Sequence, residues 1–191
     1  MQVIPWIIVG CWRVFIGYWV VSSFGVKRDA TRASWMGFWW LRMVLVFVIV
    51  GWLWGASSFG RATSHLWISN ASVVGPLAAV GAVLCVLGIG IAVWARVYLG
   101  RNWSPAPALK HGHELVTSGP YTLVRHPIYT GVILAVLGST LASPQWLIIF
   151  FLITGMFIWR VHVEEALMLK QFPNQYPEYK KRTWALIPYI W

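Results

Sequence analysis

Three apolar runs, each long enough to cross a lipid bilayer, dominate the first half of this 191-residue sequence. They cover residues 3–24, 35–56 and 73–97, and a helix crosses the hydrocarbon core in about 20 residues. Apolar residues make up 59% of the chain and charged residues only 10%, whereas an ordinary soluble domain carries about 25% charged residues. The sequence therefore excludes a lone soluble domain and a disordered chain, and it predicts three transmembrane helices within residues 1–97.

The third run also carries small residues at positions that share a helix face. Gly81, Gly88 and Ala92 leave room for another helix to come close, and Gly88 and Ala92 have the small-xxx-small spacing. We therefore expect a tightly packed helix pair at this run.

Two shorter apolar runs, residues 128–142 and 145–159, follow and are separated only by Ser143 and Pro144. At 1.5 Å per residue, a 15-residue run covers about 23 Å, which is marginal for a full crossing. Because the connection carries no charge, we predict a tight helical hairpin over residues 128–159, either fully crossing or partly re-entrant, with both ends on one side. The predicted fold is an all-α integral membrane protein with about five transmembrane helices.

Basic residues mark one side of the predicted membrane. Three of them lie between the first two runs, Arg61 lies alone between the second and third, and most of the others fall in residues 98–127 and 160–191. By the positive-inside rule, the N-terminus is outside and both polar segments are cytoplasmic, as in a prokaryotic inner-membrane protein. The net charge of +10 comes from these flanking residues, so it does not indicate nucleic-acid binding.

The first cytoplasmic segment ends in the run GPYTLVRHPIYTG, residues 119–131. Pro127 suits the first turn of a helix, and a residue before proline avoids the helical region, so His126 is expected to be extended. Free backbone N–H groups at such a helix start attract a carboxylate or a phosphate, and Tyr129 lies on the same turn. A capped helix start with an interfacial Arg125 explains the same residues without a ligand.

The second cytoplasmic segment begins as the continuation of the last apolar helix, with the run RVHVEEALMLKQF over residues 160–172. In a helix, Arg160 and Glu164 are one turn apart and can form an ion pair. Glu164 and Glu165 point about 100° apart, so one carboxylate can meet a ligand while the other meets protein.

A metal site is a weaker interpretation of the same region. Histidine and carboxylate ligands suit iron or zinc, and five candidates could converge: His111, His113, His126, His162 and Glu165. Their spacing fits no common metal-binding helix such as HExxH, so no metal site is predicted.

These residues resemble the signature of the isoprenylcysteine carboxyl methyltransferases and of their relatives, the phospholipid methyltransferases. The resemblance covers residues 98–191 and rests on residues in two groups. The first group is His113 to Tyr121, Arg125 to Tyr129, and Gly131. The second group is Arg160, Glu164, Glu165, Phe172, Tyr176, residues 178–182 and Pro188.

The resemblance implies a methyltransferase-like catalytic region over residues 98–191, with S-adenosylmethionine as the methyl donor and S-adenosylhomocysteine as the product. It places Glu164 at the polar end of this cofactor and Arg160 toward the acceptor. The residues that it implies to line the cofactor are His113, Glu114, Leu115, Val116, Tyr121, Arg125, His126, Pro127, Ile128 and Tyr129.

The chemistry of the acceptor decides which further groups are needed. A carboxylate acceptor, such as that of a prenylcysteine-like molecule, is already ionised at pH 7, and Arg160 can hold it in bidentate geometry. A phospholipid amine or a small thiol needs a general base, for which Glu165 or a histidine is the candidate. A lipid-like acceptor can enter from the bilayer between helices.

Two other classes of protein stay open at this point. A sterol-type membrane reductase would use NADPH, although such proteins resemble this chain only in their C-terminal architecture and are usually much longer. A non-catalytic scaffold or accessory subunit would bind no small molecule at all.

Overall fold

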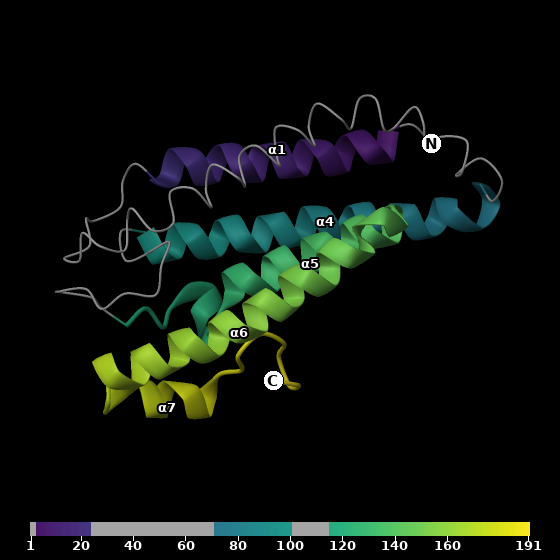
Figure 1. Ribbon diagram of the computed structural model, residues 1–191. Helices are drawn as coiled ribbons and strands as arrows, with labels where there is room; N and C mark the ends of the chain where they lie inside the picture. Colours follow the sequence, from purple (N-terminus) through teal and green to yellow (C-terminus); the bar gives the residue numbers. More distant parts are fainter. Residues whose placement is uncertain (1–2, 24–70, 101–114) are drawn as a thin grey trace. The chain divides into compact units, whose positions relative to one another are not determined.

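The computed structural model describes residues 3–23, 71–100 and 115–191. Five α-helices lie in these ranges, with two short 3-10 helices, η3 (Gly119–Thr122) and η4 (Pro144–Trp146), among them (Figure 1). The α-helices are α1 (Val3–Ser23), α4 (Ala71–Leu99), α5 (Pro127–Ala142), α6 (Leu147–Gln171) and α7 (Gln175–Arg182). The only β-type pairing within these ranges is an isolated bridge between Val124 and Trp184. The protein is therefore all-helical, as predicted.

Three of the described helices are long and apolar enough to cross a membrane: Val3–Ser22, Gly75–Leu99 and Leu147–Gln171. The first two match the predicted runs at residues 3–24 and 73–97. The predicted span at residues 35–56 lies outside the described residues. The chain is an integral membrane protein, and the count of five crossings stays a prediction.

Helices α5 and α6 are consecutive and pack against each other, with η4 between them. At the turn, the Ser143 backbone N–H donates to the carbonyl of Ser139 at 2.8 Å. Helix α5 is shorter than the three membrane-length helices, so a full crossing of the bilayer by this pair stays a prediction. Helix α6 continues without interruption to Gln171, which carries the polar run at residues 160–171 on the same helix.

The close helix pair expected at the third run is formed by α4 and α5. A methyl group added at Gly88 would come within 2.5 Å of the Gly131 carbonyl oxygen, and one added at Gly138 within 2.6 Å of the Cys85 nitrogen. Only hydrogen at these positions permits such an approach. Ala92 and Ala135 are fully buried on the same two helices.

Arg96 fixes the ends of α1 and α4. Its side chain is buried, and it donates to the carbonyl of Gly100 at 2.8 Å and to the carbonyl of Ser22 at 2.9 Å. Carbonyl groups at a helix end lack intrahelical partners, so a buried guanidinium there satisfies both helices at once.

Candidate active site

The start of α5 places the first site residue. His126 is the residue before the helix, with φ −125° and ψ 58°, and Pro127 is the first helical residue. The backbone of His126 is outside the helical region, as the following proline requires, but it is less extended than we expected.

The segment before α5 is held by the segment that follows α7. Residues 123–126 and 184–185 exchange backbone hydrogen bonds, and Leu186 extends the contact to a side chain of α5. The bonds are Arg125 N–H to Trp184 O at 2.7 Å, His126 N–H to Ala185 O at 3.1 Å, Trp184 N–H to Leu123 O at 3.3 Å, and the Thr130 hydroxyl to Leu186 O at 2.7 Å. This pairing fixes the backbone position of His126.

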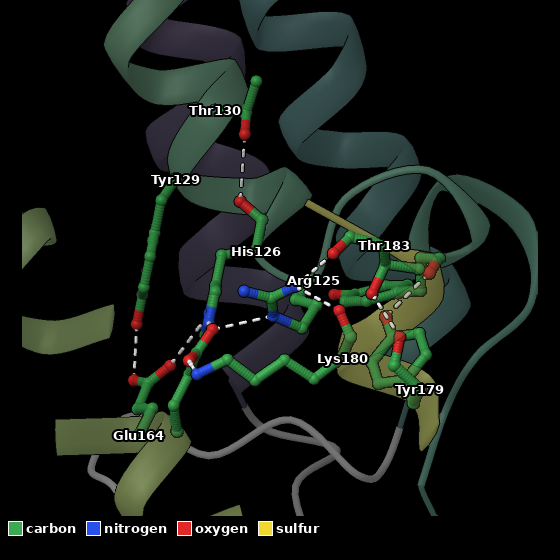
Figure 2. Close-up of polar contacts among 10 residues, drawn as sticks. Arg125, His126, Tyr129, Thr130, Glu164, Tyr179, Lys180 and Thr183 are labelled. Carbon is green, nitrogen blue, oxygen red and sulfur yellow. Dashed lines mark hydrogen bonds and ion pairs between the residues drawn. The ribbon is translucent and has the colours of Figure 1, made fainter. Parts of the chain in front are cut away.

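The His126 imidazole lies between two carboxylates of α6 (Figure 2). Its Nδ1 is 3.5 Å from Glu164 Oε2, and its Nε2 is 3.7 Å from Glu165 Oε1. These are ion-pair distances, longer than ordinary hydrogen bonds. Burial disfavours the charged ring, but Glu164 and Glu165 outweigh it and raise the pKa of His126 above its ordinary value.

Glu164 joins three elements of the site. Its Oε1 accepts a hydrogen bond from the Tyr129 hydroxyl at 2.5 Å and pairs with Arg160 Nη2 at 2.8 Å. The ion pair between Arg160 and Glu164 that their spacing predicts is therefore confirmed. The Glu164 side chain keeps 22% of its surface exposed, so a ligand can still reach it.

Glu165 is the more enclosed of the two carboxylates. It pairs with Arg125 Nε at 2.7 Å and with Lys180 Nζ at 2.6 Å, and its side chain is 9% exposed. Arg125 also donates to the carbonyl of Thr183. The Arg125 side chain is only 7% exposed, so it faces Glu165 rather than solvent, and the interfacial position that we considered for it stays a prediction.

A stack of rings leads from His126 through Tyr129 of α5 to Phe157 of α6. His126 and Tyr129 are parallel within 2° at 5.5 Å between centroids, and Tyr129 and Phe157 are within 12° at 4.3 Å. The Arg160 guanidinium carbon lies 5.6 Å from the centre of the Tyr129 ring. Arg160 therefore lies where a polar cluster meets an apolar, aromatic surface.

We call these residues the charged cluster: Arg125, His126, Tyr129, Arg160, Glu164, Glu165 and Lys180. It contains three permanent cations against two glutamates, a surplus of one before His126 is counted. Such a balance favours an anionic group in the ligand.

Among the described residues, the others implied by the resemblance take no part in these ion pairs. His113 and Glu114 are outside the described residues. Val116 is half-buried. Leu115 lines a hollow of about 420 Å³ together with α7.

Tyr121 is buried, and its hydroxyl donates to the Ala95 carbonyl at 3.4 Å. Its own carbonyl accepts from the Tyr179 hydroxyl at 2.7 Å. Burial raises the pKa of Tyr179 to about 12 and also raises the pKa of Tyr121, so both hydroxyls stay protonated. Tyr121 thus ties η3 to α4 and α7. Pro127 is buried and Ile128 half-buried at the first turn of α5.

Sequence reasoning missed three contributors to the site. Lys180 stood only as part of a basic tail, Phe157 only as part of an apolar run, and residues 184–186 carried no signal for pairing with residues 123–126. Only Lys180 could have been found, because the resemblance includes residues 178–182 without giving them a role.

The fold and the charged cluster together define a class, namely helical membrane proteins with an ion-rich site at one end of their apolar helices. A family model described as phospholipid methyltransferase matches residues 77–175, slightly more than half of the chain. The chain belongs to this family. The match includes α5 and all of the charged cluster except Lys180.

Individual relatives agree with the resemblance seen in the sequence. A probable protein-S-isoprenylcysteine O-methyltransferase of Oryza sativa subsp. indica is 25% identical, over 97% of this chain and 96% of the relative. The protein-S-isoprenylcysteine O-methyltransferase of Schizosaccharomyces pombe is 29% identical over 97% of this chain and 87% of its own length.

A solved structure of a eukaryotic intramembrane Ras methyltransferase, isoprenylcysteine carboxyl methyltransferase, is also similar. It matches with a TM-score of 0.54 and 26% identity, over 70% of this chain and 52% of that one. These similarities favour a methyltransferase over the reductase and the scaffold considered above.

Proposed function

We propose that the protein transfers a methyl group from S-adenosylmethionine to the carboxylate of a prenylcysteine-like acceptor at the cytoplasmic face of the membrane. Similarity to proteins named protein-S-isoprenylcysteine O-methyltransferase supports this reaction. The observation that carries the choice of acceptor is the position of Arg160, which pairs with Glu164 and lies beside the ring of Tyr129. That ring in turn stacks on Phe157.

The residues present fit S-adenosylmethionine. His126 Nε2 is buried and has no hydrogen-bond partner within the described ranges, so a polar ligand group can satisfy it. Glu164 offers a partly exposed carboxylate to a positive or hydroxyl-bearing group. S-adenosylmethionine supplies a methyl group on a positively charged sulfur. The residues that would hold it are Leu115, Val116, Tyr121, Arg125 to Tyr129 and Glu164, with His113 and Glu114 beside them in sequence.

Arg160 binds and orients the acceptor carboxylate in this proposal. A guanidinium carries five N–H donors and no acceptor, which suits the binding of a carboxylate. A carboxylate is ionised at pH 7, so the reaction needs positioning rather than proton removal. The ring stack of Tyr129 and Phe157 then offers an apolar surface to the lipid part of the acceptor.

Glu165 serves as a positioning residue rather than as a base. Two cations, Arg125 and Lys180, hold its carboxylate. A carboxylate paired with cations is a weaker base, because the charged form is stabilised and protonation is disfavoured. An amine or thiol acceptor would need a base, and this arrangement of Glu165 favours the carboxylate acceptor. Methylation of a phospholipid amine, which the name of the family model suggests, is the second candidate.

The proposal assigns residues 98–191 to catalysis and residues 1–97 to membrane anchoring. It keeps the predicted orientation, in which residues 98–127 and 160–191 both face the cytoplasm and residues 128–159 form a membrane hairpin between them. S-adenosylmethionine then enters from the cytoplasm and the lipophilic acceptor from the bilayer.

A methyl-transfer assay with tritiated S-adenosylmethionine tests the proposal on purified protein in nanodiscs. We expect label to enter an S-farnesylcysteine analogue as a base-labile methyl ester. The same assay is run with phosphatidylethanolamine and with small thiols. Label found only in the amine would replace the proposed acceptor with a phospholipid.

Two variants of Arg160 sharpen this assay. Arg160→Gln removes the charge and should abolish esterification, while Arg160→Lys keeps the charge without the bidentate fork and should retain a small fraction. Lys181→Gln, at an exposed ion pair with Glu178, is the control and should be fully active. Equal activity of all three variants would remove Arg160 from the reaction.

A further inference from the structure

The segment after the charged cluster ends in an exposed apolar loop, residues 187–191. Trp191 N–H donates to the Ile187 carbonyl at 3.1 Å, and Leu186 N–H donates to the Trp191 carbonyl at 2.9 Å. Tyr189 adopts a positive φ of 67° at the turn, a conformation that residues other than glycine adopt uncommonly. The loop therefore has a defined, closed backbone rather than an extended one.

The side chains of this loop point outward. Tyr189 is 83% exposed, Ile190 77%, Ile187 49% and Trp191 39%. A cluster of large apolar side chains at a loop tip is costly in water and typically marks an interaction surface.

The loop lies beside α6 at Val161 and His162. Val161 packs in one cluster with Ala185 and Leu186, and the His162 ring is 5.8 Å from the ring of Trp191. Trp159, which is 65% exposed on the same helix, precedes His162 by three residues, or about 4.5 Å along the helix axis. The loop is thus at the level where the apolar surface of α6 gives way to charged residues.

We propose that residues 187–191 insert into the headgroup region of the bilayer as an interfacial anchor. Tyrosine and tryptophan favour this depth because each combines an apolar ring with a polar tip. Trp191 of the loop contacts His162 of α6, about one helical turn from the exposed Trp159. Helix α7 supplies Arg182 nearby in sequence, which favours anionic headgroups. The bilayer is therefore the partner that fits both the position and the chemistry.

The anchor also supports the charged cluster through Leu186. The Leu186 N–H closes the apolar loop, while its carbonyl accepts from Thr130 on α5. The preceding carbonyl, that of Ala185, accepts from the His126 N–H. Insertion of the loop restrains Leu186 and Ala185, and through them it stabilises the backbone that positions His126.

Site-directed spin labelling in nanodiscs tests the location of the loop. A label at Ile190→Cys, with Cys11 and Cys85 replaced by serine and alanine, should be more accessible to oxygen than to a polar nickel complex. A label at Lys181→Cys, on an exposed polar residue of α7, should show the reverse. Low accessibility of the Ile190→Cys label to both reagents would mean that protein covers the loop, and preference for nickel would mean that water does; either result overturns the proposal.

Hydrogen exchange tests the link to the site. In nanodiscs, the double variant Tyr189→Asp and Ile190→Asp should exchange amides of residues 124–126 several-fold faster than the conservative variant Tyr189→Phe and Ile190→Leu. Peptides of α4 should exchange equally in both, which shows that the fold is intact. Equal exchange at residues 124–126 would overturn the link, and neither measurement depends on methyl transfer.

Discussion

Two interfaces of α5 are built on opposite principles. Along its length, α5 meets α4 through glycine and alanine with almost no side chain between the backbones. Just before its first turn, Arg125 and His126 pair with glutamates of α6 over a few ångströms, and Lys180 of α7 pairs with the same helix. The first interface depends on shape and the second on charge, so the first should fail when volume is added and the second when charge is removed.

The largest effect is expected from adding volume to the first interface. A methyl at Gly131 would come within 2.5 Å of the Gly88 carbonyl oxygen and 2.6 Å of the Ala92 nitrogen. These are backbone atoms, which cannot move aside, so Gly131→Val should lower the free energy of unfolding by about 3 kcal/mol or more. Yield and thermal unfolding in detergent measure this.

The control for this variant is Gly155→Ala on α6, where an added methyl meets nothing within 4 Å. It should be neutral or slightly stabilising, since alanine favours helix. Comparable loss in both variants would mean that α4 and α5 do not pack through their glycines.

The second-largest loss of stability is expected when a charge is removed from the second interface. Glu165→Gln leaves Arg125 buried and without its anion, and breaking such a buried pair costs about 3 kcal/mol. Chemical unfolding should show this loss, whereas Glu178→Gln, at an exposed pair with Lys181, should change stability by less than about 0.5 kcal/mol. Equal stabilities would show that Glu165 is not enclosed.

A smaller change separates hydrogen bonding from packing at the same interface. Tyr129→Phe keeps the ring between His126 and Phe157 but removes the hydroxyl that donates to Glu164. A hydrogen bond to a charged group contributes about 1.5–3 kcal/mol, so S-adenosylhomocysteine binding by calorimetry should weaken about tenfold with only a modest loss of stability. Unchanged affinity would place Glu164 away from the cofactor.

The smallest expected effect is a change with pH in the contribution of the charged interface to folding stability. Because the pKa of His126 is raised in the folded protein, its charged form stabilises the fold fully below its ordinary pKa of 6.5 and this contribution is lost as pH rises through the higher folded value. The stability difference between the wild type and His126→Asn should therefore shrink as the pH rises above 6.5. A difference that grows over this range would contradict the ion pairs of His126.

Local patterns in the sequence predicted what depends on local structure. Run lengths predicted α1 and α4, proline predicted the start of α5, and helical spacing predicted the ion pair of Arg160 with Glu164. The two glutamates do have different partners, as their angular separation implies, but both also reach His126, which no spacing along one helix could indicate.

The pairing between segments distant in sequence could not be predicted from the sequence. Residues 184–186 bond to residues 123–126 and to α5 through backbone groups that every residue carries, so side-chain identity gives no sign of it. The basic residues taken as markers of membrane topology also differ in their burial and in their bonding partners. Arg96 and Arg125 are buried and bond to carbonyl oxygens or to a glutamate, which simple charge counting cannot distinguish from a solvated flank.

The bond from the His126 N–H to the Ala185 carbonyl has a consequence for biosynthesis. A ribosome that has made α5 and α6 has not yet released Ala185, whose carbonyl holds residue 126 in place. The charged cluster can therefore be completed only after the helices on which most of it lies have been synthesised. A product arrested before residue 184 would contain α5 and α6 but lack the hydrogen bond that holds the backbone of His126.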